Sequence, residues 1–294
     1  MVELTRLAKK HSLNGRVFAK LEFMSPGFSK KDRIAKFIIE QAEASGNLKP
    51  GMTVIEATSG NTGISLALTC AIKGYPFIAV MSEGNTPERR FMIEQFGGRV
   101  ELVSQHPDSP PGKVTGKDLG LVKERFEELA SELNAFKVGQ FTSELNPLAH
   151  YTHTAKEIVQ AVPQLDAFCD FIGTGGSFEG IAKYLKEQNS DIKCFIVEPT
   201  KETHIIQGGG YFKKVPFERV ENCDGRIGIT CEQTLLWQKE ILTVEGIAAG
   251  ISSGSNMAAA VHYLKENPGK SVLVLINDTV LNYVSFYARG GHAH

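Results

Sequence analysis

The sequence predicts an α/β protein in which helices cover mostly parallel sheets on both faces. Two observations predict this class: short apolar runs alternate with segments of helical period, and turns containing Gly or Ser join them. Strands that alternate with helices form parallel sheets buried on both sides. Such sheets bind ligands beyond the carboxyl ends of their strands, and several Gly-rich turns of this chain fall at those ends. A ligand site built from these turns is therefore expected.

The expected elements follow this rhythm along the whole chain. Residues 17–23 alternate as a strand does, and the apolar stripe over 34–42 is typical of a helix that ends near Gly46. Further strands are expected over 53–57, 77–81, 100–103, 168–172, 193–197 and 272–276. Further helices are expected over 64–72, 88–95, 121–133, 155–161, 178–187, 233–245 and 256–266. The segment 106–117 contains three prolines and is expected to form an exposed loop or flap.

Length, composition and charge exclude several classes of protein. A chain of 294 residues is long enough for one large or two modest domains, and its 42% hydrophobic and 22% charged residues are typical of globular proteins. The 32 Lys and Arg residues against 33 Asp and Glu give a net charge of −1, unlike the basic surface of a nucleic-acid binder. No apolar run is long enough for a membrane-spanning helix, so no membrane partner is expected.

The N-terminus and the cysteines favour a cytoplasmic location. Residues 1–16 carry too many charges for a signal peptide. The five cysteines form no C-x-x-C pair, which disfavours both a disulfide framework and a zinc site. They are Cys70, Cys169, Cys194, Cys223 and Cys231. We expect reduced thiols and no metal.

The strongest local signal is a Gly-rich loop between an apolar strand and a helix. It consists of Gly173, Thr174, Gly175, Gly176 and Ser177. Small residues at a helix start let backbone N–H groups and hydroxyls converge on one point, where the helix dipole adds positive potential. Phe178 stands where the dinucleotide-binding pattern needs a glycine, and no Gly-Lys-Ser/Thr of a P-loop follows. The loop predicts a site for one phosphate monoester; the alternative is a turn without a ligand.

A second loop, within 56–67, also lies between a strand and a helix. Thr58, Ser59, Asn61 and Thr62 present hydroxyls and an amide at the helix N-terminus. This arrangement suits a carboxylate. The alternative is a capped turn with no ligand.

A third segment, 22–37, places lysines at the start of a helix. Ser29 is expected to cap that helix, with Lys30 and Lys31 in its first turn. The dipole at this end disfavours cations and lowers the pKa of an amine, which favours its action as a nucleophile toward an aldehyde. The alternative is a pair of surface lysines.

Together the three segments resemble the cysteine synthase (O-acetylserine sulfhydrylase) and cystathionine β-synthase family, fold-type II enzymes that depend on pyridoxal 5'-phosphate. The family pattern N-P-G-G-S-x-K-D-R corresponds to residues 25–33, and its register makes Lys31 the Schiff-base lysine and Lys30 a solvated neighbour. Further matches lie, in family order, at 58–62, 88–90, 140–141, 146–147, 150–151, 173–177, 204–208 and 245–255. The resemblance therefore covers nearly the whole chain.

This resemblance implies the tryptophan-synthase β-like fold, with two domains that each contain a twisted, mostly parallel sheet covered by helices. Residues 1–35 and 136–294 would form the larger, cofactor-binding domain. Residues 36–135 would form a smaller, mobile domain that closes over the substrate. A homodimer is also expected.

The resemblance implies a role for each matching site residue. Lys31 would bind pyridoxal phosphate covalently and would then remove the substrate α-proton. Asn61 would bond the phenolic oxygen of the cofactor, Gly250 would lie beside it, and the Gly-rich loop would hold its phosphate through Gly173, Thr174, Gly175, Gly176 and Ser177. The substrate would be bound by Thr58, Ser59, Thr62, Gln140 and Gly208.

The implied partner of the pyridine nitrogen is Thr279, which aligns with the serine of the family segment P-x-S-G-E-R-Y-L-S. A neutral hydroxyl does not stabilise a protonated pyridine as a carboxylate does, so β-elimination is favoured over racemisation or transamination. The alternative is an ordinary loop residue. Three departures from the family pattern are 280–282 in place of Gly-Glu-Arg, Phe28 in place of a small residue, and Tyr211 near the leaving-group pocket.

The implied activity is β-elimination and β-replacement on L-serine derivatives through an aminoacrylate. Cysteine synthase, which makes L-cysteine from O-acetylserine and sulfide, is favoured; a cystathionine β-synthase or a cysteine lyase that releases sulfide is the alternative. The expected partners are an amino-acid substrate and a sulfide, thiol or water nucleophile, with no nucleic acid. Outside these enzymes, a degenerate paralogue acting as a binding partner stays open, and a nucleotide-binding module is disfavoured because both nucleotide fingerprints are missing.

Overall fold

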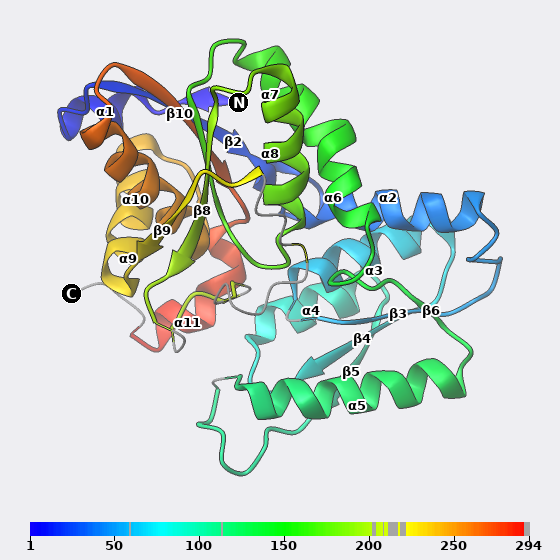
Figure 1. The fold of residues 1–294 in the computed structure, drawn as a ribbon. Coiled ribbons are helices and arrows are strands. Elements are labelled where there is room, and N and C mark those ends of the chain that lie inside the picture. Colours follow the sequence, from blue (N-terminus) through cyan, green and yellow to red (C-terminus); the bar gives the residue numbers. More distant parts are fainter. Residues whose placement is uncertain are drawn as a thin grey trace. The chain divides into compact units, whose positions relative to one another are not determined.

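The computed structural model describes residues 1–58, 60–112, 114–201, 204–207, 209–210, 217 and 222–290. The chain divides into two compact units, and each contains its own sheet (Figure 1). The larger unit includes Met1–Met24 and Glu144–Leu281, and the smaller unit consists of Ser25–Ser143 and Asn282–Gly290. The predicted cofactor-binding role of one domain and the closing motion of the other stay predictions.

A six-stranded sheet forms the centre of the larger unit. Its strand order is β1-β2-β10-β7-β8-β9, and every neighbouring pair is parallel except the antiparallel pair of β1 and β2. The strands are β1 (Val2–Glu3), β2 (Gly15–Leu21), β7 (Ala167–Phe171), β8 (Lys193–Pro199), β9 (Gly225–Ile229) and β10 (Lys270–Ile276). Strand β10 therefore lies between β2 and β7, and its carboxyl end leads directly to Asn277 and Thr279.

Helices cover both faces of this sheet, as Figure 1 shows. They are α1 (Thr5–Lys10), α6 (Leu145–Ala149), α7 (Ala155–Ala161), α8 (Gly176–Gln188), α9 (Cys231–Glu240) and α10 (Ile251–Glu266), with π-helical turns at His150–Thr154 and Ile241–Glu245 and a 3-10 turn at Glu22–Met24. Ile158 of α7 and Ile181 of α8 pack with Phe168 and Leu273 of the strands in one buried cluster. Because successive strand residues point to opposite faces, Val272 and Val274 are buried on the side opposite Leu273.

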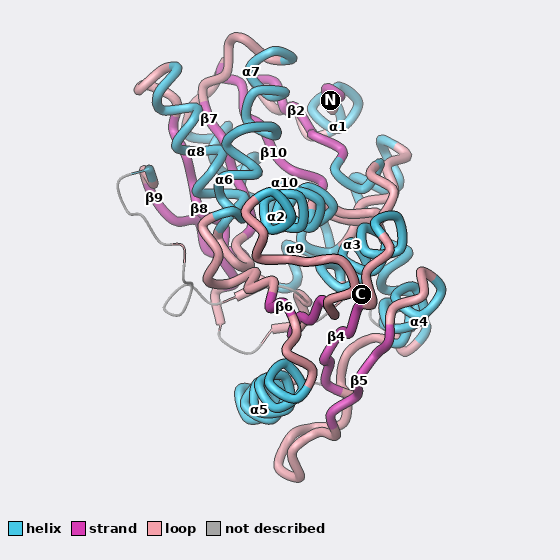
Figure 2. Tube along the Cα trace, turned by 90° about the vertical axis from the view of Figure 1, so that its right-hand side faces the viewer, coloured by secondary structure: helices cyan, strands magenta, loops and turns pink. Residues whose placement is uncertain are grey.

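The smaller unit contains a four-stranded parallel sheet in the order β5-β4-β3-β6. Its strands are β3 (Val54–Ala57), β4 (Phe77–Ser82), β5 (Arg99–Val103) and β6 (Phe136–Lys137), and its helices are α2 (Lys31–Ala44), α3 (Asn61–Lys73), α4 (Pro87–Gln95), α5 (Gly116–Glu132) and α11 (Val284–Ala288), which follows a 3-10 turn at Val280–Tyr283. Helix α5 covers one face through Phe126, which packs on Ile55 and Val80. Helices α2, α3 and α4 lie on the other side (Figures 1 and 2).

The predicted fold class is confirmed, and each predicted strand matches an observed strand to within two residues. The strands β1, β6 and β9 and the helices α1, α6 and α11 were missed: β1 and β6 have only two residues each, β9 has glycine at two of its five positions, and the three helices have five or six residues. Helix α10 starts five residues before its predicted start at 256. Its first turns consist of small residues that let α9 approach: a Cβ at Gly254 would lie 2.0 Å from the Thr234 carbonyl oxygen. Small residues give no apolar period, so the pattern missed them.

Within the part of the chain that the structure describes, no helix is long and apolar enough to cross a membrane.

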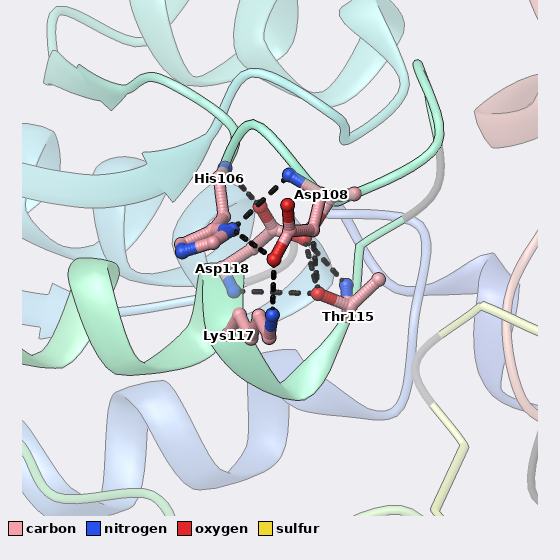
Figure 3. A network of polar contacts seen from close by, with 6 residues as sticks. His106, Asp108, Thr115, Lys117 and Asp118 are labelled. Carbon is pink, nitrogen blue, oxygen red and sulfur yellow. Dashed lines mark hydrogen bonds and ion pairs between the residues drawn. The ribbon is translucent and has the colours of Figure 1, made fainter.

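The loop between β5 and α5, predicted as an exposed loop or flap, is held at its base by Asp118 (Figure 3). The buried Asp118 carboxylate accepts hydrogen bonds from the N–H groups of His106 and Thr115, both at 2.7 Å, and from the Thr115 hydroxyl at 2.8 Å. Burial by itself would raise the pKa of Asp118, but these hydrogen bonds, with a further one from Ser109, outweigh it and lower the pKa to about 2. The charged Asp118 carboxylate therefore joins the two ends of the loop, His106 and Thr115, to the first turn of α5.

Replacing Asp118 with alanine is expected to lower the free energy of unfolding by about 2 kcal/mol near neutral pH, since the N–H groups of His106 and Thr115 lose their acceptor and α5 loses the carboxylate half of its capping box. The folded pKa lies below the ordinary value of 3.8, so the contribution is present above that value and is lost as pH falls to about 2. Urea unfolding near neutral pH and at about pH 2 measures this contribution to stability. Asp108→Ala, which removes the exposed ion pairs to Lys117 and His106 but leaves the Asp118 contacts in place, is the control and should change stability little.

Candidate active site

Asp32 fixes the loop that precedes α2. Its carboxylate accepts hydrogen bonds from Gly27 N at 2.6 Å and from Ser65 Oγ of α3 at 2.5 Å. A Cβ at Gly27 would lie 2.2 Å from Asp32 Oδ1, so a side chain there would displace the carboxylate. Gly27 before Lys31 and Asp32 after it therefore contact each other directly.

Lys31 is the first residue of α2 and is half-buried. Its N–H donates to Ser29 Oγ at 3.2 Å, and Ser29 has no exposed surface. The N-cap of α2 is nevertheless Lys30, without a side-chain cap bond, so the predicted cap at Ser29 is one residue too early. Lys30 is only 7% exposed, and the prediction that it is a solvated charge is wrong. The helical period begins after Lys30, so the spacing of residues did not show which way its side chain turns.

Phe28 adopts a left-handed backbone conformation in this loop, with φ +61°. Its N–H donates to the Ser25 carbonyl oxygen at 2.8 Å, which closes a tight turn over 25–28. This conformation is unfavourable for a residue with a bulky side chain, so the turn itself suits the small residue of the family pattern better. The phenylalanine ring is 39% exposed, which places an aromatic surface three residues before Lys31.

The loop after β3 brings Thr58 and Thr62 to the N-terminus of α3, where both are buried. Gly60 N donates to Thr58 Oγ1 at 3.1 Å. Gly60 has φ +142°, and a Cβ there would lie 1.9 Å from Arg89 Cδ, so glycine is required at this turn. The start of α3 leaves N–H groups without intrahelical acceptors, which is the chemistry that a carboxylate needs. Ser59, also predicted for this site, lies outside the described residues.

Gln140 lies against Thr62 and the buried residue Glu56. Its Oε1 accepts from Thr62 Oγ1 at 2.6 Å, and its Nε2 donates to the Ala57 carbonyl oxygen at 3.0 Å and to Glu56 Oε1 at 3.4 Å. Glu56 Oε2 in turn accepts from the N–H groups of Gly139 at 2.7 Å and Gln140 at 3.3 Å. Burial raises the pKa of Glu56 to about 7, although these hydrogen bonds oppose the rise. The sequence pattern did not single out Glu56.

Asn61 is the first residue of α3, and its side-chain oxygen accepts a hydrogen bond from Asn282 Nδ2 at 3.1 Å. Asn282 is 4% exposed. Asn282 stands where the family pattern has the arginine of Gly-Glu-Arg. The sequence showed this substitution, but it did not show that Asn282 contacts Asn61.

In the larger unit, the predicted phosphate loop joins β7 to α8 as expected. Gly175 has φ +89° and directly precedes α8, so the loop turns sharply and the first N–H groups of a 13-residue helix face its end. Thr174 and Ser177 are buried, and hydrogen bonds to neighbouring side chains fix both hydroxyls. Ser177 Oγ donates to Asp170 Oδ2 at 2.5 Å, and Asn146 Nδ2 donates to Thr174 Oγ1 at 3.0 Å. This set of backbone donors fits the phosphate of pyridoxal phosphate.

Gly250 and Thr279 lie side by side at the end of β10. An isolated antiparallel bridge pairs Ala249 with Thr279, and Gly250 N donates to the Asp278 carbonyl oxygen at 2.8 Å. Thr279 is 3% exposed, and its Oγ1 accepts from Leu281 N at 3.4 Å, which keeps the hydroxyl proton as a donor. A buried neutral hydroxyl with its proton to donate fits a pyridine nitrogen.

The predicted site residues therefore fall in two groups, one in each unit. The smaller unit carries Lys31, Thr58, Asn61, Thr62 and Gln140, and the larger unit carries Gly173, Thr174, Gly175, Gly176, Ser177, Gly250 and Thr279. The structure brings Thr62 to Gln140, and Gly250 to Thr279. Gly208 and Tyr211 lie outside the described residues. Among the described residues no group of three or more His, Cys, Asp or Glu side chains is placed to hold a metal ion.

Gly176→Ala is expected to weaken the binding of pyridoxal phosphate about tenfold and to lower the free energy of unfolding by about 1–3 kcal/mol. A Cβ at Gly176 would lie 2.1 Å from Asn146 Oδ1, and moving that buried amide breaks its hydrogen bond to Thr174. Titrating apo-protein with the cofactor and unfolding it in urea give the two values. Gly120→Ala is the matched control, because a Cβ at this exposed position of α5 meets no atom within 4 Å; its affinity for the cofactor should equal that of the wild type.

The chain is similar to known proteins over nearly its whole length. Residues 1–278 match the family described as "Pyridoxal-phosphate dependent enzyme". A protein named cysteine synthase B from Campylobacter jejuni is 39% identical over 287 residues, which cover 94% of this chain and 92% of that protein. Mouse (Mus musculus) cystathionine beta-synthase is 36% identical over 304 residues, covering 97% of this chain and 53% of that protein. A solved hydrogen sulfide-producing enzyme from Fusobacterium nucleatum has a TM-score of 0.85 and 36% identity, with 93% of each chain covered.

These similarities confirm four predictions made from the sequence: the family, the α/β fold of fold-type II enzymes, the enzyme class and the cofactor. They also agree with the predicted activity and its alternatives, since the names of the relatives include both a cysteine synthase and a cystathionine beta-synthase. The individual roles of the site residues stay predictions. The chain belongs to the family of pyridoxal-phosphate dependent enzymes.

Proposed function

We propose that this protein catalyses β-replacement on an L-serine derivative, with O-acetyl-L-serine as the donor and sulfide as the nucleophile, so that L-cysteine is the product. The observation that carries the proposal is Thr279: a buried neutral hydroxyl stands at the end of β10, where a pyridine nitrogen partner is expected. A neutral partner favours expulsion of a group from the substrate β-carbon over racemisation or transamination. The similarity to a cysteine synthase supports the choice of donor and nucleophile.

The proposed chemistry divides between the cofactor and side chains of this chain. Pyridoxal phosphate, when bound, delocalises the negative charge that forms at the substrate α-carbon. Lys31 Nζ would bind the cofactor and later accept the α-proton of the substrate. Residues 173–177 would hold the cofactor phosphate with backbone N–H groups at the start of α8. Thr279 would donate its hydroxyl proton to the ring nitrogen.

Substrate binding would depend on the N-terminus of α3. Thr58 and Thr62 lie there, and the N–H groups of the first turn favour a carboxylate. The side-chain oxygen of Gln140 and its amide N–H groups already contact Thr62, Ala57 and Glu56. We therefore propose that Gln140 supports the carboxylate site chiefly by holding Thr62, and that Ser59 completes the site.

Two alternatives use the same first step with a different donor or nucleophile. A thiol nucleophile such as homocysteine would give a cystathionine β-synthase, and L-cysteine as the donor would give a lyase that releases sulfide. The solved neighbour that produces hydrogen sulfide favours the second alternative. We propose that Phe28 also influences which donor and nucleophile are accepted, because this exposed aromatic residue lies three residues before Lys31.

One spectral titration tests the proposal. The holoenzyme is mixed separately with L-serine, O-acetyl-L-serine, O-phospho-L-serine and L-cysteine, and the visible absorption of the bound cofactor is recorded. We expect O-acetyl-L-serine to change the spectrum at the lowest concentration and subsequent sulfide to restore it with release of L-cysteine. A response to L-cysteine alone, with release of sulfide, would replace the synthase by the lyase. Purified protein that stays colourless after addition of pyridoxal phosphate would support the degenerate paralogue.

We also propose a cytoplasmic location and a homodimeric state. All five cysteines are free, and burial raises the pKa of the Cys70 and Cys194 thiols to about 12, which keeps both protonated and unreactive. This thiol state suits a reducing compartment. Light scattering of the purified protein tests the dimer, for which a mass near that of one chain would be the contrary result.

A further inference from the structure

The residues that follow Thr279 form a short segment that is attached to the smaller unit. The part that belongs to the smaller unit is Asn282–Gly290, and its first residue, Asn282, contacts Asn61 at the start of α3. Ser285 binds Glu88 of α4 twice: its N–H donates to Oε1, and its Oγ donates to Oε2 at 2.9 Å. Tyr283 is 1% exposed, and the guanidinium of the buried Arg89 lies over its ring at 4.8 Å from the centroid. Neighbouring contacts on α4 therefore hold the backbone that carries Asn282.

The contact fixes which end of the Asn61 amide points away from Asn282. A side-chain amide has one acceptor, its oxygen, and one donor group, its nitrogen. Asn282 donates to the oxygen of Asn61, so the Asn61 nitrogen occupies the other end of the amide. The phenolic oxygen of pyridoxal phosphate is an acceptor and needs a donor. A reversed amide would instead place two oxygens against each other.

We propose that Asn282 is a positioning residue for the cofactor: by holding the oxygen of Asn61, it directs the Asn61 amide nitrogen toward the cofactor's phenolic oxygen. The inference rests on the proposed function and on the role that the family resemblance implies for Asn61, a bond to this phenolic oxygen. It assigns a function to a position where this chain departs from the family pattern, which has an arginine there. Asn282 itself need not touch the cofactor.

The proposal is tested with two substitutions that differ in chemistry. Asn282→Ala removes the Nδ2 donor that orients the oxygen of the Asn61 amide. Asn282→Asp keeps the shape but presents only acceptors, so it attracts the Asn61 nitrogen and reverses the amide. We expect Asn282→Ala to weaken cofactor binding about fivefold and Asn282→Asp about tenfold or more. Both should change the ratio of the visible to the near-ultraviolet absorption band of the bound cofactor.

Ser285→Ala is the matched control. It lies in the same segment and loses its hydroxyl contact to Glu88, yet it does not touch Asn61. Its cofactor affinity and band ratio should equal those of the wild type. If Ser285→Ala changes both as much as Asn282→Ala does, attachment of the segment as a whole is responsible, and the proposal is overturned.

A double-mutant cycle with Asn61→Ala separates this inference from the function on which it rests. In the Asn61→Ala background, Asn282→Ala should have no further effect on affinity or band ratio, because the residue through which it acts is missing. An equal effect in both backgrounds would overturn the proposal. If Asn61→Ala changes the spectrum but neither Asn282 variant does, only the role of Asn282 fails. If Asn61→Ala itself has no effect, the proposed role of Asn61 fails as well.

Discussion

Replacing Lys31 with alanine is expected to abolish the activity, lowering kcat/KM by roughly a thousandfold or more, as removal of a catalytic nucleophile does in other enzymes. The same variant should lose the visible absorption of covalently bound pyridoxal phosphate. The physical reason is that Lys31 would supply the amine that bonds to the aldehyde, and it opens α2 in a loop fixed by Ser29 and Asp32. Mass spectrometry after borohydride reduction should find the cofactor on the peptide that contains Lys31.

Two further lysines make this result specific. Lys36→Ala lies on the exposed side of α2 and should keep the absorption band and the activity. Lys30→Ala removes a buried side chain next to Lys31, so it should lower stability while keeping the cofactor on Lys31. Reduction that labels the Lys30 position, or an unchanged spectrum in Lys31→Ala, would contradict the assignment of the catalytic lysine.

The periodicity of the sequence was sufficient to predict the central strands of both sheets but not all of the edge strands. Strands such as β4 and β10 are continuous apolar runs because both faces are covered, and such runs are easy to recognise. The strands that were missed lie at sheet edges: β1, β6 and β9 are each paired on one side only, and they are short. An edge strand needs fewer apolar residues, so its pattern is weaker.

The residues expected to touch the cofactor could be predicted from the sequence, whereas the residues that hold them in place could not. Gly-rich loops and the lysine carry patterns that spacing reveals, and they occur at helix starts as expected. Supporting residues carry no such pattern. Asp170 lies seven residues before Ser177, and Asn282 lies more than two hundred residues after Asn61, so only the fold brings them together. Glu56 looked like one more residue in a strand, although it is a buried carboxyl.

Glu56 is expected to make the protein less stable as pH rises through neutrality. The pKa of Glu56 is about 7 when folded, against 4.5 for an ordinary glutamate, so the folded protein binds this proton more tightly than the unfolded chain does. The resulting stabilisation is fully present below pH 4.5 and is lost as pH rises to about 7, with an upper limit of about 3 kcal/mol. Urea unfolding at about pH 5 and about pH 8 measures the difference.

The variant Glu56→Gln has no proton to lose, so its stability should change less between these two pH values than that of the wild type. Glu132→Gln, at an exposed position of α5 in the same unit, is the control and should keep the wild-type pH dependence. Because Glu56 holds the turn that carries Gln140, its ionisation also bears on the proposed carboxylate site. We therefore expect KM for the amino-acid substrate to change between pH 6 and pH 8, roughly one unit either side of this pKa, in the wild type and not in Glu56→Gln. An equal change in stability between pH 5 and pH 8 in the wild type and in Glu56→Gln would show that Glu56 does not titrate over this interval and would remove the basis of both expectations.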